Sequence, residues 1–120
     1  MSRFTDVFIL PISKRDLEAY RGVARRMGRL YRRHGALRYR EFVADGLRNR
    51  SSFFPLPAAL KLKAGEIVVY SAIEYRSEAH RNRVMDLVLE DPASRALGSE
   101  GGLFDLSRMV YSPFKLLVEA

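Results

Sequence analysis

The sequence lacks cysteine and tryptophan, and it contains no long run of apolar residues. Without cysteine, the protein has neither disulfide bonds nor thiolate metal ligands, and nothing points to an oxidising compartment. No apolar run approaches the roughly 18 residues that a membrane span needs, and residues 1–6 carry charges where a signal peptide has its apolar core. We therefore expect a cytoplasmic protein that forms one domain over residues 1–120.

Motifs for bound cofactors are also missing. Gly98, Gly101 and Gly102 precede a predicted strand, whereas a phosphate-binding loop follows a strand and opens into a helix. The two histidines, His34 and His80, have no metal-ligand spacing, and we expect His34 to cap the end of a helix. We therefore expect no cofactor and no metal, and the sequence favours neither a nucleotide-dependent nor a covalent mechanism.

Positive charge is in excess, since 21 lysines and arginines face 14 acidic residues and give a formal charge of +7. Eight of the basic residues fall within residues 14–33, on the outer side of a predicted helix. A nucleic-acid-binding face usually interleaves aromatic residues with basic ones, and here the aromatics lie elsewhere. We interpret the segment as a solvated helix face, so nucleic acid is not an expected partner. Binding of nucleic acid or acidic lipid by this helix stays open as an alternative.

The stretch richest in β-branched and aromatic residues is 66–75, with the sequence EIVVYSAIEY. Apolar side chains occupy both sides of this predicted strand, Val69 and Ile73 on one and Val68 and Tyr70 on the other, as is typical of a strand covered on both faces. The helices of so short a chain can cover one face of its sheet. We therefore expect a second copy of the chain to cover the other, giving a homodimer through the sheet face.

The remaining chain supplies further strands and two long helices. Pro11 is expected to end the first strand because it cannot donate to a ladder, and Ser13 is expected to cap the first helix. In the second helix, Arg81 is expected to be solvated. The predicted strands cover 4–10, 36–44, 58–63, 66–75 and 104–111, and the predicted helices cover 13–34 and 77–90. This order predicts an α+β, ferredoxin-like βαββαβ fold with an antiparallel sheet and an extra hairpin strand at 58–63.

Many of these residues also match a known family pattern. They are Glu66, Val68 to Tyr75, Ser77, Ala79, Arg81, Asp91-Pro92, Phe104-Asp105, Arg108-Met109, Tyr111 and Phe114, together with Pro11, Tyr20, residues 34–37 and Glu41. On these residues the chain resembles the YbaA-like bacterial family of unknown function over nearly its whole length. The resemblance implies a dimeric α+β barrel, in which two ferredoxin-like sheets pack face to face. It also implies an alternative function as a cofactor-independent enzyme, monooxygenase-like or isomerase-like, on a small organic substrate.

Polar residues on otherwise apolar strands are the candidates for a ligand site, because the cavity of an α+β barrel lies between the sheet and the elements that cover it. An enclosed carboxylate there could serve as a general base or a ligand anchor. As an alternative to a ligand site, each charged residue forms a structural ion pair and each tyrosine packs in the core. The candidates are Asp6, Tyr39, Glu41, Tyr70, Glu74, Arg108 and Tyr111. We expect a homodimer that binds a small molecule through these residues, and the sequence assigns no catalytic residue.

Overall fold

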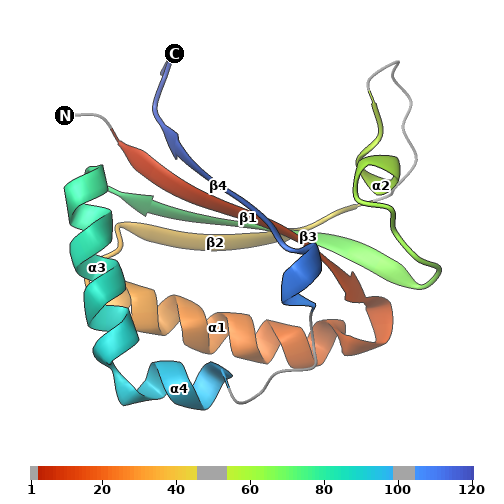
Figure 1. Cartoon of the computed structure of the whole chain (residues 1–120), viewed down its shortest axis with the longest axis horizontal. Helices are drawn as coiled ribbons and strands as arrows, with labels where there is room; N and C mark the ends of the chain where they lie inside the picture. Colours follow the sequence, from red (N-terminus) through yellow and green to blue (C-terminus); the bar gives the residue numbers. More distant parts are fainter. Residues whose placement is uncertain (1–2, 46–53, 99–104) are drawn as a thin grey trace.

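A computed structural model describes residues 3–45, 54–98 and 105–120 of the protein. Its sheet has four strands in the order β2-β3-β1-β4, and every neighbouring pair is antiparallel (Figure 1). The elements are β1 (Phe4–Ser13), α1 (Leu17–Arg33), β2 (Arg38–Val43), α2 (Leu56–Ala59), β3 (Glu66–Tyr75), α3 (Glu78–Glu90), α4 (Pro92–Gly98) and β4 (Val110–Lys115). This strand order, with α1 and α3 as the two crossovers, confirms the predicted ferredoxin-like α+β fold.

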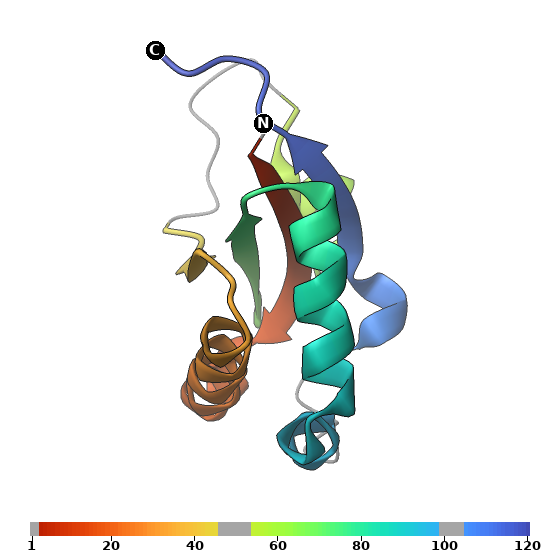
Figure 2. The ribbon, with the colours of Figure 1, turned by 90° about the vertical axis from the view of Figure 1, so that its left-hand side faces the viewer.

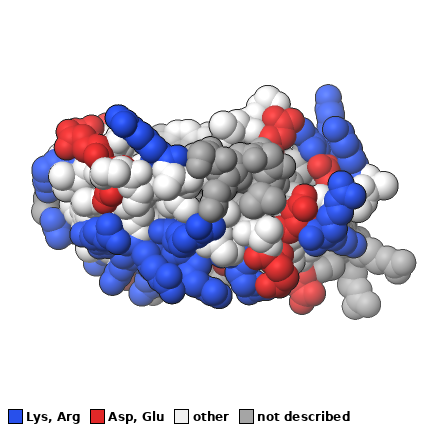
Figure 3. Space-filling model, turned by 90° about the horizontal axis from the view of Figure 1, so that it is seen from below, with Lys and Arg blue, Asp and Glu red and all other residues white. Residues whose placement is uncertain are grey.

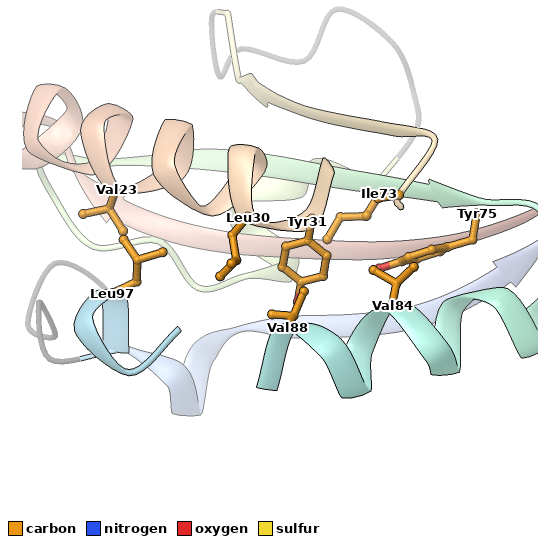
Figure 4. Packing of buried hydrophobic residues seen from close by; sticks show 9 residues of the cluster. Val23, Leu30, Tyr31, Ile73, Tyr75, Val84, Val88 and Leu97 are labelled. Atoms are coloured by element: carbon orange, nitrogen blue, oxygen red, sulfur yellow. The ribbon is translucent and has the colours of Figure 1, made fainter. Parts of the chain in front are cut away.

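The helices α1, α3 and α4 all lie on one side of the sheet, which we call the helix side (Figures 1 and 2). Val69, Ile73 and Tyr75 of β3 point to this side, where they join buried residues of the helices. Figure 4 shows Ile73 and Tyr75 in one layer with side chains of α1, α3 and α4. The sequence could not say which side of the predicted strand meets the helices, and the structure assigns it to the odd-numbered residues.

The opposite side of the sheet, which we call the open face, carries one apolar row that crosses all four strands. Phe42 pairs with Tyr70, Tyr70 pairs with Ile9, and Ile9 pairs with Val110 in the three ladders. Phe42, Tyr70 and Val110 keep 38–48% of their surface exposed, and Phe114 of β4 keeps 53%. Large apolar side chains are therefore presented side by side on a face that α1, α3 and α4 do not cover.

The predicted strand at 58–63 is wrong, and the predicted strand at 104–111 is only partly right. Part of the predicted hairpin strand at 58–63 belongs to the short helix α2, because Pro55 and Pro57 favour the first turn of a helix and Pro57 cannot donate to a ladder. Part of the predicted strand at 104–111 is a 3₁₀ turn at Leu106–Arg108, in which the Asp105 carboxylate accepts from the backbone N–H of Ser107 at 2.9 Å. The last strand therefore begins only at Val110.

Pro11 does not end β1, which continues to Ser13. Because β4 pairs only with Phe4 to Ile9, β1 has a neighbour on one side alone at Pro11, and proline is tolerated there. Ser13 makes no capping hydrogen bond, and a 3₁₀ turn at Lys14–Asp16 leads into α1 instead. The end of α1 is as expected, because Gly35 adopts a positive φ of 112° that suits glycine.

We predict that Gly28→Ala and Gly22→Ala, two changes in the same helix, have opposite effects on stability. A Cβ at Gly28 would lie 2.8 Å from the Tyr39 ring, whereas a Cβ at Gly22 would have no neighbour within 4 Å. Gly22→Ala should raise the free energy of unfolding by up to about 1 kcal/mol through helix propensity. Gly28→Ala should lower it by roughly 1–2 kcal/mol, because the packed ring must move. Urea denaturation measures both, and a stabilised Gly28→Ala variant would contradict the packing described here.

Candidate functional site

A groove of about 400 Å³ runs between α1 and the edge strand β2, and we call it the α1–β2 groove. Gly28 lets the two elements approach, because its missing side chain leaves room for the Tyr39 ring. The arginines of α1 that line the groove recur at intervals of four, four and three residues, so they share one side of the helix. The lining residues are Arg21, Ala24, Arg25, Gly28, Arg29, Arg32, Tyr39 and Glu41.

Glu41 of β2 lies in this groove and accepts two tyrosine hydroxyls. The Tyr39 hydroxyl donates to one carboxylate oxygen at 2.5 Å, and the Tyr20 hydroxyl donates to the other. Burial raises the pKa of both tyrosines, and the Glu41 charge raises each pKa further. Both hydroxyls therefore stay protonated at neutral pH, and the carboxylate is held by two donors that do not ionise.

The arginines of the groove differ in whether another residue contacts their guanidinium group. Arg21 lies 3.2 Å from Glu18, and Arg32 donates to the backbone carbonyl of Leu37. Among the described residues, Arg25 and Arg29 have neither an ion pair nor a hydrogen bond. Seen from the helix side, lysine and arginine side chains gather over one continuous part of the surface (Figure 3). The groove thus offers two guanidinium groups that are free to bind an anion.

A second polar cluster lies under the beginning of α3, and we call it the Asp6 cluster. Asp6 is 3% exposed. The hydroxyl of Tyr111 donates to one of its carboxylate oxygens at 2.7 Å, and Nε of Arg81 lies 3.2 Å from the other. Nη2 of Arg81 also donates to the Tyr111 hydroxyl at 2.9 Å. The expectation that Arg81 is solvated is therefore wrong, because it contacts a buried carboxylate.

The remaining candidate ligand-site residues lie outside the α1–β2 groove and the Asp6 cluster. Tyr70 and Glu74 are on the open face, where Glu74 lies 3.5 Å from Arg38. Arg108 donates to both carboxylate oxygens of Glu66, at 2.6 and 2.9 Å, and this pairing lowers the pKa of Glu66 to about 2. Arg108 thus ties the 3₁₀ turn before β4 to the beginning of β3, as a structural ion pair would.

The seven predicted residues therefore do not form one site. The structure brings Tyr39 together with Glu41, and Asp6 together with Tyr111. Sequence reasoning missed Tyr20 and Arg81 as polar partners of these acids. Tyr20 falls in the apolar stripe of α1, so its hydroxyl gives no signal of its own. A buried carboxylate needs a hydrogen-bond or ion-pair partner, but the sequence does not show that Arg81 is the partner of Asp6.

Within residues 3–45, 54–98 and 105–120, no group of three or more His, Asp or Glu side chains could hold a metal ion. In the same part of the chain, no helix is long and apolar enough to cross a membrane.

Comparison with known proteins identifies the family. Residues 3–105 match the model of a family described as a protein of unknown function, DUF1428. The chain belongs to the DUF1428 family. It is 30% identical over 118 residues to the uncharacterized protein YbaA of Escherichia coli K12, and the alignment covers 98% of each chain. YbaA of Shigella flexneri matches equally well, so the resemblance seen in the sequence is confirmed.

Solved structures extend the comparison to the fold. A dimeric ferredoxin-like protein from an uncultured marine organism superposes with a TM-score of 0.58 at 12% identity, with 100% of each chain covered. Rv0793 of Mycobacterium tuberculosis gives a TM-score of 0.59 at 15% identity, with 99% of each chain covered. At these identities the likeness concerns the fold alone. This member of the DUF1428 family therefore has a ferredoxin-like fold.

We predict that Glu41→Gln shifts tyrosine ionisation to lower pH. The unfolded chain loses phenol protons near pH 10, whereas burial and the Glu41 charge raise the pKa of Tyr20 and Tyr39 in the folded protein. The free energy of unfolding therefore falls as the pH rises above about 10, where the unfolded chain loses its phenol protons first. Without the Glu41 charge, both pKa values should fall, so absorbance at 295 nm should rise at a lower pH. Glu74→Gln, on the open face, is the control, and identical titration curves for the two variants would contradict the assignment.

Proposed function

We propose that the protein is a homodimer that packs its open faces together and binds a small anionic molecule in the α1–β2 groove. The observation that carries the dimer is the apolar row formed by Phe42, Tyr70, Ile9 and Val110. Contiguous apolar surface on a soluble protein commonly marks an interface. A ferredoxin-like neighbour with the same overall fold is described as dimeric, which supports this assembly.

The ligand proposal rests on the chemistry of the α1–β2 groove. Its volume of about 400 Å³ falls in the usual range for a small-molecule site, roughly 300–1,000 Å³. Arg25 and Arg29 supply forked donors that match carboxylate or phosphate oxygens. The Glu41 carboxylate has lone pairs beyond those used by Tyr20 and Tyr39, so it can accept from a ligand hydroxyl. The groove therefore suits a small anion that also carries a hydroxyl group.

We predict that Tyr70→Lys converts the dimer to a monomer. Tyr70 is in the middle of the apolar row, and a charge there would be buried without a partner in the dimer. Light scattering at micromolar concentration measures the assembly. Leu89→Lys is the matched control, because Leu89 is 64% exposed on α3, which packs on the helix side.

The expected result is a folded Tyr70→Lys monomer and an unchanged Leu89→Lys dimer. A Tyr70→Lys variant that remains dimeric, or a parent chain that is monomeric at this concentration, would rule out association through the open face. Val69→Lys is unsuitable as a test, because Val69 is buried on the helix side and its loss would disturb the core.

We predict that the double change Arg25→Ala and Arg29→Ala weakens citrate binding by at least about tenfold, since each guanidinium hydrogen bond to an anion contributes about 1.5–3 kcal/mol. Titration calorimetry at fixed ionic strength measures the affinity. The double change Arg76→Ala and Arg83→Ala removes the same charge from exposed positions outside the groove and should have little effect. Tricarballylate, which is citrate without its hydroxyl, should bind more weakly than citrate because it cannot donate to Glu41.

Two outcomes would contradict this ligand proposal. Equal loss of citrate binding in both double variants would mean that net charge, rather than the groove, attracts the anion. Retention on heparin that survives about 0.3 M salt, and that the Arg25 and Arg29 changes abolish, would favour the alternative of a polyanion-binding surface.

A further inference from the structure

Two apolar segments flank the open face, one at each end of the strands. The first is the α2 segment, residues 54–60, and the second is the stretch 116–120 after β4, which we call the β4 tail. Figure 1 shows both on the side of the sheet opposite α1, α3 and α4, with α2 near the beginning of β3 and the tail near its end. A molecule that packs on the open face would therefore meet both segments.

The β4 tail exposes its apolar side chains almost completely. Leu117 keeps 93% of its surface exposed and Val118 keeps 75%. The N–H of Leu116 donates to the carbonyl of Arg3 at 3.0 Å, which fixes the start of the tail beside the beginning of β1. A hollow of about 490 Å³ is lined both by the tail and by strand residues such as Thr5. The tail is thus anchored at its start but is not packed closely on its own sheet.

The other end of the open face is already covered within the chain. Val68 points to the open face but is only 1% exposed, and its ladder partner Pro11 is also buried. The α2 segment at this end presents apolar side chains of its own, because Phe54 is 76% exposed and Leu56 is 41% exposed. Exposed apolar groups beside an apolar sheet face are typical of a surface that continues into an interface.

The position of α2 limits how two open faces can meet. Facing sheets pack about 10 Å apart, and a single helix is itself about 10 Å across. If both copies had α2 at the same end, two helices would have to fit between the sheets, and the apolar rows could not touch. If one copy is reversed end to end, each α2 segment lies where the other copy has its β4 tail (Figure 1). Only the reversed alignment lets the apolar rows meet.

We propose that the homodimer adopts this reversed alignment, with the β4 tail of each copy packed on the α2 segment of the other. The inference rests on the homodimer proposed above and names the second contact that completes it. A two-fold axis makes the contact occur twice. Charge also favours it, because Lys61 and Lys63 after α2 and Glu119 in the tail form no ion pair with another described residue.

The test uses the absence of cysteine from the chain. Leu56→Cys and Leu117→Cys are made in separate full-length chains with tags of different size, refolded together and treated with a short bis-maleimide, which does not demand disulfide geometry. The mixture should give a covalent dimer that contains one chain of each kind. Neither variant alone should give a covalent dimer, because like segments lie at opposite ends. Leu89→Cys on α3, mixed with Leu117→Cys, is the control that should not link.

A second measurement needs no reagent. Leu117→Ser should raise the dissociation constant of the dimer by about tenfold or more, because a leucine side chain would no longer be buried at each of two contacts. Leu89→Ser, an equal change on the helix side, should leave it unchanged. Sedimentation over a range of concentrations measures both.

The two readouts separate the alignment from the dimer itself. A parent chain that is monomeric in light scattering would remove the homodimer, and this inference with it. A dimeric parent would overturn the alignment alone if Leu117→Cys or Leu56→Cys linked to itself, if their mixture gave no product, or if the Leu89→Cys control linked equally well. An unchanged dissociation constant for Leu117→Ser would also overturn it.

Discussion

The ladder between β1 and β3 determines which side chains meet the helices and which do not. Ten consecutive residue pairs, from Phe4 opposite Tyr75 to Ser13 opposite Glu66, fix the sidedness of both central strands. Because side chains alternate along a strand, a slip of one residue would exchange the two faces. The core with α1 and α3, the apolar row on the open face and the position of Asp6 all follow from this one register.

The helix side combines an ordinary apolar core with an unusual share of hydroxyl groups. Of the six tyrosines in the sequence, five lie on this side or on α1, and three of them donate hydrogen bonds to two carboxylates. Tyr20 and Tyr39 satisfy Glu41, whereas Asp6 shares Tyr111 with a guanidinium. The two acids therefore have different environments: Glu41 borders an open groove lined by cations, and Asp6 is enclosed in an ion pair without net charge.

Local patterns predicted the regular elements well and the polar partners poorly. The strand at 66–75 has the predicted bounds, because its composition is strongly β-forming and Gly65 precedes it. The strand prediction for residues 58–63 was wrong because the alternation of apolar and polar residues there is weak, and Pro55 and Pro57 favour the start of a helix instead. The pairs Glu41 with Tyr20 and Asp6 with Arg81 could not be predicted, because each joins distant elements through ladder registers that the sequence leaves open. For the same reason, the sequence could not show which side of the strand at 66–75 faces the helices.

The position of β4 has a consequence for the order in which the molecule folds. The Asp6–Tyr111 hydrogen bond joins residues 105 positions apart, so the chain must close a very large loop before β4 can pair with β1. Loop-closure entropy delays such contacts, and we expect β1, β2 and β3 to form a sheet first. The final step would then complete two features at once, the apolar row through Val110 and the enclosure of Asp6 through Tyr111. A nascent chain that has not yet added β4 would have neither a complete apolar row nor an enclosed Asp6 carboxylate.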